Sequence, residues 1–272
     1  MKKFLLVLAL LSVLLVSCMK KETLSFVVIP SEDAMLARSQ WEPMMSYLGE
    51  GMGREVDLIV ASDYAAVVEA MRYGHADIAR LSPVGYVTAI SEGAEIEPLV
   101  VGVKLETGLP GYYAYLVARA KTDVSDLSSL TFAFVDPSST SGYVVPAIHL
   151  EEQGIEPADV LFAGSHQAAI LAVQNGSVDV AAVASNRLET ALSEGVIQDG
   201  ELEIIWQSPL IPNCPVAVQS SMPDRDRARL KELLLNAPGD VILSTGINET
   251  YYVEASDEIY DPIREILQFK DK

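Results

Sequence analysis

The sequence is poor in cysteine, histidine and positive charge, and each shortage excludes a class of protein. Its 272 residues contain two cysteines and three histidines. Cys18 belongs to the N-terminal segment discussed below, so Cys214 has no partner for an intrachain disulfide, and we expect it to be a buried, inert thiol. Neither His75 nor His149 has a second histidine or cysteine at ligand spacing. We therefore expect no metal site and no cofactor.

Basic residues are outnumbered two to one, with 19 Lys and Arg against 38 Asp and Glu, which gives a net charge of −19. A chain of this charge repels phosphate backbones, so we expect no nucleic-acid partner. A small anion is not excluded, because a desolvated site is governed by nearby donors and dipoles, whereas net charge is screened over ~10 Å. The hydrolase motif Gly-x-Ser-x-Gly is absent, and the neighbours Ser165 and His166 cannot easily form a nucleophile–base pair. We expect no enzyme.

No apolar run is long enough to cross a bilayer. Residues 4–16 follow Lys2 and Lys3 and form a run of 13 residues, shorter than the ~20 that a membrane span needs, so residues 1–17 are predicted to be a signal peptide. The run ends in Leu-Val-Ser-Cys, which resembles a bacterial lipobox whose cysteine, Cys18, carries the lipid. Removal of Lys2 and Lys3 takes the net charge from −19 to −21. The sequence thus predicts a protein on the extracytoplasmic face of the cell envelope, anchored in the membrane through Cys18 and a tether of residues 18–23.

The remaining chain alternates short β-branched runs with amphipathic stretches. This alternation is typical of βαβ units, and it predicts an α/β fold of mostly parallel sheets covered by helices on both faces. Strand-like residues 112–120 and 215–220 are predicted to cross between two lobes, lobe 1 comprising residues 24–115 and 217–272 and lobe 2 residues 116–216. Strands are predicted over residues 24–29, 55–60, 77–81, 99–103, 131–135, 160–163, 178–184 and 202–206, and helices over 35–48, 65–73, 84–90, 141–152, 167–174 and 187–192.

An internal repeat relates the two halves at an offset of 102 positions. Tyr64-x-Ala-x3-Ala-x3-Gly-x2-Asp77 matches His166-x-Ala-x3-Ala-x3-Gly-x2-Asp179. Each copy predicts a helix with small residues at every fourth position, a glycine that ends it, and a strand that begins at the aspartate. Duplicated βα units can be purely structural. However, Tyr64 and His166 both fall at helix starts, where ligands bind in open α/β sheets, so the two rings could face one cleft.

Three adjacent hydroxyls, Ser139, Thr140 and Ser141, follow a predicted strand at the start of a predicted helix. A helix start offers unpaired N–H groups and the positive end of the helix dipole, which together favour an anion. One serine before a helix is ordinarily a cap, but three exceed what capping needs. Both interpretations stay open on this segment alone.

Together, the segments YAAVVEAMRYGHADIARLSPVGYV, DPSSTSGYVVP and GSHQAAILAVQNGSVDVAAV resemble the substrate-binding proteins of phosphate, phosphite and phosphonate ABC importers. The resemblance implies a two-lobed, type II-like periplasmic binding protein that closes on a small phosphorus oxyanion and delivers it to an ABC permease and its ATPase. Each lobe would be a mostly parallel sheet flanked by helices, and two crossover strands would join the lobes. It also implies the ligand-binding residues Ser139, Thr140, Ser141, Tyr64, Tyr86 and His166.

Two positions depart from the family pattern. Asn186 stands where relatives that take aminoalkyl phosphonates have a carboxylate, so an amine-bearing ligand is not expected; Asn186 would hydrogen-bond the ligand or cap the following helix. Ser82 replaces a glycine before Pro83 and could add a hydroxyl to the cleft. Tyr112, Tyr113, Tyr115, Trp41 and Trp206 are interpreted as packing. Two other functions stay open, a sensor that reports to a membrane kinase or chemoreceptor, and a binding protein for a different small ligand.

Overall fold

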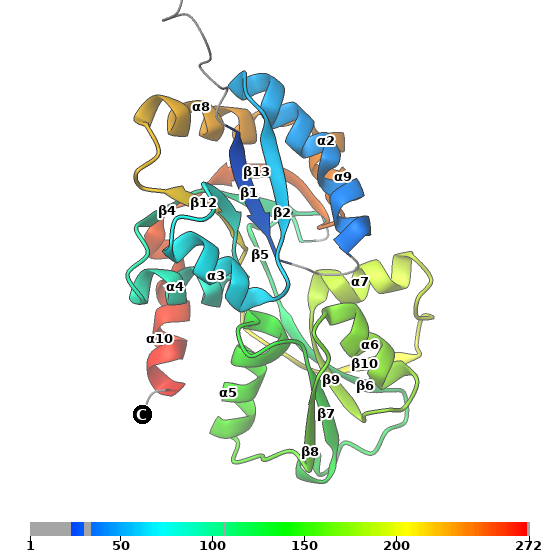
Figure 1. The fold of residues 1–272 in the computed structure, drawn as a ribbon. Coiled ribbons are helices and arrows are strands. Elements are labelled where there is room, and N and C mark those ends of the chain that lie inside the picture. Colours follow the sequence, from blue (N-terminus) through cyan, green and yellow to red (C-terminus); the bar gives the residue numbers. More distant parts are fainter. Residues whose placement is uncertain (1–22, 30–33, 106, 271–272) are drawn as a thin grey trace, which may run out of the picture.

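The computed structural model describes residues 23–29, 34–105 and 107–270, which fold into two lobes, each a sheet flanked by helices (Figure 1). This confirms the predicted fold class. The predicted signal peptide, Cys18 and all but the last residue of the tether lie outside the described residues. Among the helices of the described ranges, none combines the length and the apolar character that a membrane span requires.

Lobe 1 is built on a six-stranded sheet. Strand β1 pairs in parallel with β2 and β3, whereas β12 runs antiparallel to β3 and β4, and β13 antiparallel to β4. The sheet is mixed because β12 enters it as the chain returns from lobe 2. In spatial order its strands are β13 (Glu249–Glu254), β4 (Ile96–Lys104), β12 (Pro215–Gln219), β3 (Ile78–Arg80), β1 (Leu24–Val28) and β2 (Val56–Val60).

Apolar helix faces cover both sides of this sheet. One core joins the sheet to α2 (Ala34–Met52), α8 (Asp224–Leu235) and α9 (Gly239–Ser244). The core on the other side includes α3 (Tyr64–Arg72), α4 (Pro83–Ser91) and α10 (Asp261–Lys270), which follows the turn η3 (Asp257–Tyr260). The second core continues into lobe 2 through Val144 and Val145, so the two lobes share apolar packing.

Lobe 2 is built on a five-stranded sheet in which β7 pairs in parallel with β8 and β9, and β6 runs antiparallel to β9 and β10. Helices α6 and α7 pack on one face and α5 on the other. The strands in order are β10 (Leu202–Gln207), β6 (Ala114–Arg119), β9 (Val180–Ala184), β7 (Thr131–Phe134) and β8 (Asp159–Phe162). The helical elements are η1 (Leu127–Ser129), η2 (Thr140–Val144), α5 (Val145–Glu152), α6 (His166–Gln174) and α7 (Ser185–Ser193).

The chain crosses between the sheets at β5 (Gly111–Tyr112) and β11 (Ile211–Pro212), which pair with each other in antiparallel orientation. Strand β6, from Ala114, already belongs to the sheet of lobe 2, and β12, from Pro215, to that of lobe 1. The lobe boundaries given above stay a prediction, but this two-stranded ribbon is where the described chain would bend if the lobes moved.

The structure confirms the repeat as two equivalent βα units. Asp63 and Ser165 cap α3 and α6, each accepting a hydrogen bond from the backbone N–H three residues on. Asp77 accepts hydrogen bonds from the N–H and hydroxyl of Ser25, the second residue of the neighbouring strand β1. Asp179 accepts hydrogen bonds from the N–H and hydroxyl of Thr131, the first residue of the neighbouring strand β7. The matched aspartates therefore pin the matched strands, and both first residues of the repeat, Tyr64 and His166, begin a helix.

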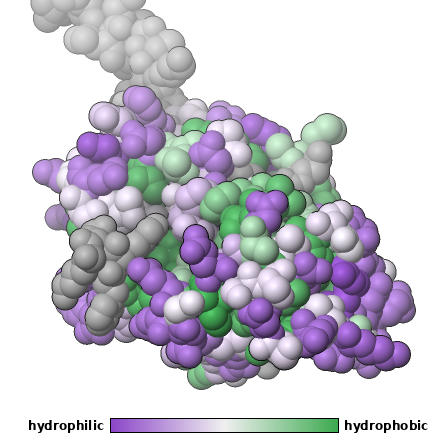
Figure 2. Space-filling view, turned by 90° about the horizontal axis from the view of Figure 1, so that it is seen from below, coloured by the Kyte–Doolittle hydropathy of each residue, from purple (hydrophilic) through white to green (hydrophobic). Residues whose placement is uncertain are grey.

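The surface at the lobe 2 end mixes polar side chains with apolar patches (Figure 2). Val160, Leu161 and Phe162 of the edge strand β8 are each more than 40% exposed. Tyr143 contacts Phe134 and Phe162 edge-to-face, with ring centroids 5.0 and 5.1 Å apart. Phe162 of β8 is thus the exposed rim of a packed aromatic cluster.

Candidate functional site

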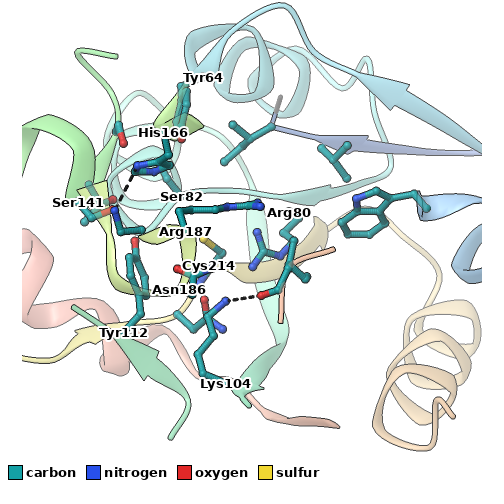
Figure 3. A pocket seen from close by; sticks show the side chains of 18 residues that line it. Tyr64, Arg80, Ser82, Lys104, Tyr112, Ser141, His166, Asn186, Arg187 and Cys214 are labelled. Atoms are coloured by element: carbon teal, nitrogen blue, oxygen red, sulfur yellow. Dashed lines mark hydrogen bonds between the residues drawn. The ribbon is translucent and has the colours of Figure 1, made fainter. Parts of the chain in front are cut away.

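A cavity of about 60 Å³ lies between the lobes, at the carboxyl ends of strands from both sheets (Figure 3). It exceeds the roughly 10–15 Å³ that one water requires, yet it is far below the ~300 Å³ at which pockets for drug-sized ligands begin. It therefore suits a ligand of only a few atoms. Seven of the eight residues predicted to bind ligand line it: Tyr64, Ser82, Ser139, Thr140, Ser141, His166 and Asn186.

The three hydroxyls begin a helical turn of π type, η2, which continues directly into α5. Ser139 caps this turn, its hydroxyl accepting from the N–H of Gly142 at 3.1 Å. Only glycine fits at position 142, because a Cβ there would lie 2.4 Å from Val135 and 2.7 Å from the Ser139 hydroxyl. The backbone N–H groups at such a start have no carbonyl partner within the helix. Ser139 is thus a cap and a cavity-lining residue at once, so the two interpretations of this segment are compatible.

Two buried phenols face these hydroxyls. The Tyr64 phenol lies beside Ser139, and that of Tyr112 lies beside Ser141. Burial raises the pKa of Tyr64 to about 12 and also raises that of Tyr112, so both rings keep their protons at neutral pH. Hydroxyl protons rotate freely between partners. The cluster can therefore turn several O–H groups toward an anion without a fixed countercharge.

His166 supplies a single N–H donor. Its Nδ1 accepts a hydrogen bond from the backbone N–H of Ala184 at 3.2 Å, so the proton of the neutral ring is on Nε2. Burial, together with nearby Arg187, lowers the pKa of His166 to about 3. A neutral imidazole therefore faces the cavity at physiological pH.

We expect His166→Gln to flatten the acid side of the stability–pH curve. The pKa is about 3 in the folded chain and 6.5 in the reference state, so between these values the unfolded chain binds more protons and acid favours unfolding. The wild-type free energy of unfolding should thus lose up to about 1.4 kcal/mol per pH unit from this residue as the pH falls from 6.5. Urea unfolding between pH 7 and 4.5 measures the slope, with the exposed His75→Gln as control. Equal slopes for wild type and His166→Gln would contradict the assignment.

Hydrogen bonds across the cavity rim join the lobes. The Ser82 hydroxyl caps α4 by accepting from the N–H of Gly85 at 2.9 Å, and it donates to the Ser138 carbonyl at 3.2 Å. The Val84 N–H donates to the Thr140 hydroxyl at 2.9 Å. The lobes are thus closed on each other, and in this arrangement the proton of Ser82 is already donated to protein.

Of the two roles predicted for Asn186, a contact with the ligand or a helix cap, the structure excludes the cap. Helix α7 begins at Ser185 after Ala184, with no side-chain cap bond. The Asn186 side chain is buried and lines the cavity instead. Its carboxamide can donate or accept a neutral hydrogen bond there.

The lining is positively charged although the chain is strongly negative. Arg80, Lys104 and Arg187 line the cavity, and no aspartate or glutamate does so within the described ranges. Nor do these ranges contain a group of three or more His, Cys, Asp or Glu side chains that could hold a metal ion. Hydroxyls, one neutral N–H, an amide and cations make a cavity suited to a small anion.

The model of the family "ABC transporter, phosphonate, periplasmic substrate-binding protein" matches residues 26–260. The chain belongs to this phosphonate-binding protein family. The phosphate-import protein PhnD of Mycolicibacterium smegmatis is 30% identical, over 90% of this chain and 85% of that protein. The phosphonates-binding periplasmic protein of Escherichia coli is 27% identical, over 93% and 78%. A solved binding protein of an ABC phosphonate transporter from Pseudomonas aeruginosa, 28% identical, superimposes with a TM-score of 0.81 over 93% of this chain and 87% of that one.

The family consists of transport substrate-binding proteins and is not an enzyme family, and membership implies a periplasmic or other extracytoplasmic location. Ser165, the nucleophile considered for a hydrolase, caps α6 by accepting from the N–H of Ala168 at 3.1 Å. Ser165 therefore has a structural role at the start of this helix.

Tyr86 is the predicted ligand-binding residue that the structure does not bring to the cavity. It is fully buried in α4, its ring packs on Tyr260 with centroids 4.7 Å apart, and its hydroxyl donates to Asp257 at 2.7 Å. Burial and this carboxylate raise the pKa of its phenol. The ring is directed toward η3 and α10, so Tyr86 joins α4 to the C-terminal elements rather than facing the ligand.

Several cavity residues were missed or interpreted as packing. Tyr112, assigned to packing on the crossing strand, lines the cavity, and Cys214, expected to be buried and inert, is half-buried in its wall. Trp41 packs in the lobe 1 core as expected and also reaches the lining. Arg80 and Lys104 end β3 and β4, so the rule that ligands bind at the carboxyl ends of strands could have indicated both. The remaining lining residues are Val28, Ile29, Ala184, Arg187, Asn213 and Ile247.

Arg80, Lys104 and Asn213 converge on one buried carboxylate, Glu249. Its Oε1 lies 2.7 Å from Arg80 Nη2, 3.0 Å from Lys104 Nζ and 2.7 Å from Asn213 Nδ2. Burial by itself would raise the pKa of Glu249, but Lys104 and Arg80 lower it to about 2. The carboxylate is therefore ionised, and two cations share one anion beside the cavity.

Proposed function

We propose that this protein captures a small phosphorus oxyanion, such as phosphite, phosphate or a phosphonate, between its lobes and delivers it to an ABC permease and ATPase. The observation that carries the proposal is the set of donors around the cavity. Ser139, Thr140, Ser141 and Tyr64 supply hydroxyls and His166 supplies a neutral N–H, in a cavity without a described acidic side chain. Hydrogen bonds to a charged acceptor are stronger than those between neutral groups.

Capture would be completed by closure. The donors come from both lobes, Tyr64 from lobe 1 and the hydroxyl triad with His166 from lobe 2, so an anion bound between them favours the closed state. The ribbon of β5 and β11 would be the hinge, and the bonds of Ser82 and Val84 to lobe 2 would form as the cavity shuts.

Isothermal titration of ligand-free protein tests the ligand class. We expect heat of binding with at least one of phosphite, methylphosphonate and phosphate, and affinities at least tenfold weaker for sulfate, which is permanently a dianion, and for acetate. Binding of acetate or sulfate without binding of any phosphorus oxyanion would reject the proposal and leave the family fold with a different ligand. A sensor would give the same binding data, but its gene would lack a neighbouring permease and ATPase.

We further propose that Cys18 carries a lipid that anchors the protein to the membrane. The support is the lipobox-like sequence before Cys18 and the extracytoplasmic location that the family implies. In cells, Cys18→Ala should move the protein from the membrane fraction to the soluble fraction. Cys214→Ala is the matched control and should stay with the membrane.

A further inference from the structure

The cavity has two chemically different ends. Tyr64, His166 and Ser141 lie toward one end, Arg80 and Lys104 lie toward the other, and the side chain of Arg187 extends between them (Figure 3). We call the pair Arg80 and Lys104 the cationic end. Tyr112 contacts both ends, because its hydroxyl lies beside Ser141 and Lys104 Nζ lies 6.0 Å from the centre of its ring. A ligand held by the hydroxyls would therefore direct its substituent toward the cationic end.

Among the residues that the structure describes, the formal charges at the cationic end do not balance. Arg80 and Lys104 bring two formal positive charges to the single negative charge of Glu249. Burial lowers the pKa of Lys104, against the opposing effect of Glu249, as is typical of a buried cation that is only partly neutralised. Both cationic side chains are at most about 10% exposed, so water screens them poorly. A buried charge without a partner is costly, and such charges are ordinarily paired or neutralised. One positive charge thus remains for an anion that is not part of this cluster.

Hydrogen-bonding capacity also remains at this end. Within the described structure, the buried Arg80 Nε has no hydrogen-bond partner, and neither has the second oxygen of Glu249, Oε2. Lys104 Nζ, with three N–H groups, donates to the Ile247 carbonyl at 3.1 Å and to Glu249 at 3.0 Å, which leaves one. An unsatisfied buried donor is expensive. Both donors belong to side chains that line the cavity, where a ligand could accept from them.

Resting on the proposed function, we infer that the preferred ligand carries a second anionic group, a carboxylate one or two bonds from the phosphonate, which binds at the cationic end. The phosphonate would occupy the hydroxyl end and the carboxylate would neutralise the excess charge beside Arg80 and Lys104. An ammonium substituent would be placed beside the two cations Arg80 and Lys104, and no described carboxylate lines the cavity to pair with it. The ligand class is thus a short carboxyalkyl phosphonate rather than an aminoalkyl phosphonate.

Titration calorimetry of the wild-type protein tests this with phosphonoacetate and with phosphonoacetamide, its isostere in which a neutral amide replaces the carboxylate. Methylphosphonate and 2-aminoethylphosphonate are measured alongside them. A charge-assisted contact predicts that phosphonoacetate binds at least about tenfold more tightly than phosphonoacetamide, and 2-aminoethylphosphonate most weakly. Equal affinities for the two isosteres, or a preference for the amine, would overturn the inference. If no phosphonate binds at all, the proposed function fails with it, whereas binding of methylphosphonate with no gain from the carboxylate rejects the inference alone.

Lys104→Met and Arg80→Met assign the effect to the cluster, since each leaves one cation paired with Glu249 and removes the excess charge. Each should reduce the preference for phosphonoacetate over phosphonoacetamide to less than about threefold. Lys231→Met, which removes a surface lysine paired with Glu254, is the matched control and should change nothing. Equal weakening of methylphosphonate and phosphonoacetate would show that the cluster acts on the phosphonate group and would overturn the inference. The comparison of isosteres on wild type decides the matter if a variant does not fold.

Discussion

Replacing Glu249 with glutamine should lower the free energy of unfolding by about 3–5 kcal/mol, because it leaves Arg80 and Lys104 buried together without an anion. Glu249 is completely buried, and it faces Lys104 across the β4–β13 pair. The site depends on a tight local fit, since a Cβ at Gly102 would lie 2.0 Å from the Glu249 carboxylate. For a chain of this size the melting temperature should fall by on the order of 10 °C.

Thermal and urea unfolding of ligand-free protein measure this effect. Glu254→Gln is the matched control, because it lies on the same strand, is exposed, and forms a surface ion pair with Lys231 at 2.9 Å. Surface pairs of this kind contribute about 0–1 kcal/mol, so the control should behave like wild type. If Glu249→Gln were as stable as the control, the buried charge cluster would not have the energetic role that its geometry indicates.

Truncation of the hydroxyl triad should give the largest loss of affinity. Ser141→Ala removes one hydroxyl that would donate a hydrogen bond to the charged ligand. Binding should weaken by about 1.5–3 kcal/mol, which is roughly 10- to 100-fold. Thr140→Ala should add to this loss, and it also removes the acceptor of the interlobe bond from Val84. The double variant should therefore bind more weakly than either single variant.

Ser138→Ala is the control for the triad, because Ser138 precedes it in the same loop but does not line the cavity. Calorimetry with methylphosphonate measures the affinities, and melting curves without ligand separate lost binding from lost stability. Affinity unchanged in both Thr140→Ala and Ser141→Ala would mean that the triad only caps η2.

Features that depend on local sequence could be predicted. The alternation of strands and helices gave the α/β lobes, and the repeat placed Tyr64 and His166 at matched helix starts. Ser139, Thr140 and Ser141 were found because a strand, a cap and a helix are adjacent in the chain. Each strand, cap or helix start is specified by neighbouring residues, so its signal can be found within a short segment of the sequence.

Features that depend on distant partners could not be predicted. Tyr86 was predicted to bind the ligand, but its hydroxyl donates a hydrogen bond to Asp257, which lies 171 residues away in the sequence. Glu249 meets Arg80 across 169 residues and Lys104 across 145, so no local pattern shows that the three charges converge. The π-type turn was predicted as the start of an ordinary helix, because the close approach of Gly142 to Val135 is a tertiary contact.

A crystal structure of the protein with methylphosphonate tests the central claim most directly. We predict the three phosphonate oxygens between the lobes, within about 2.6–3.2 Å of the hydroxyls of Ser139, Thr140 and Ser141, the Tyr64 phenol and Nε2 of His166. The methyl group should point toward Arg80 and Lys104. A phosphonate bound outside this cavity, or bound inside it without contact to the triad and His166, would contradict the account.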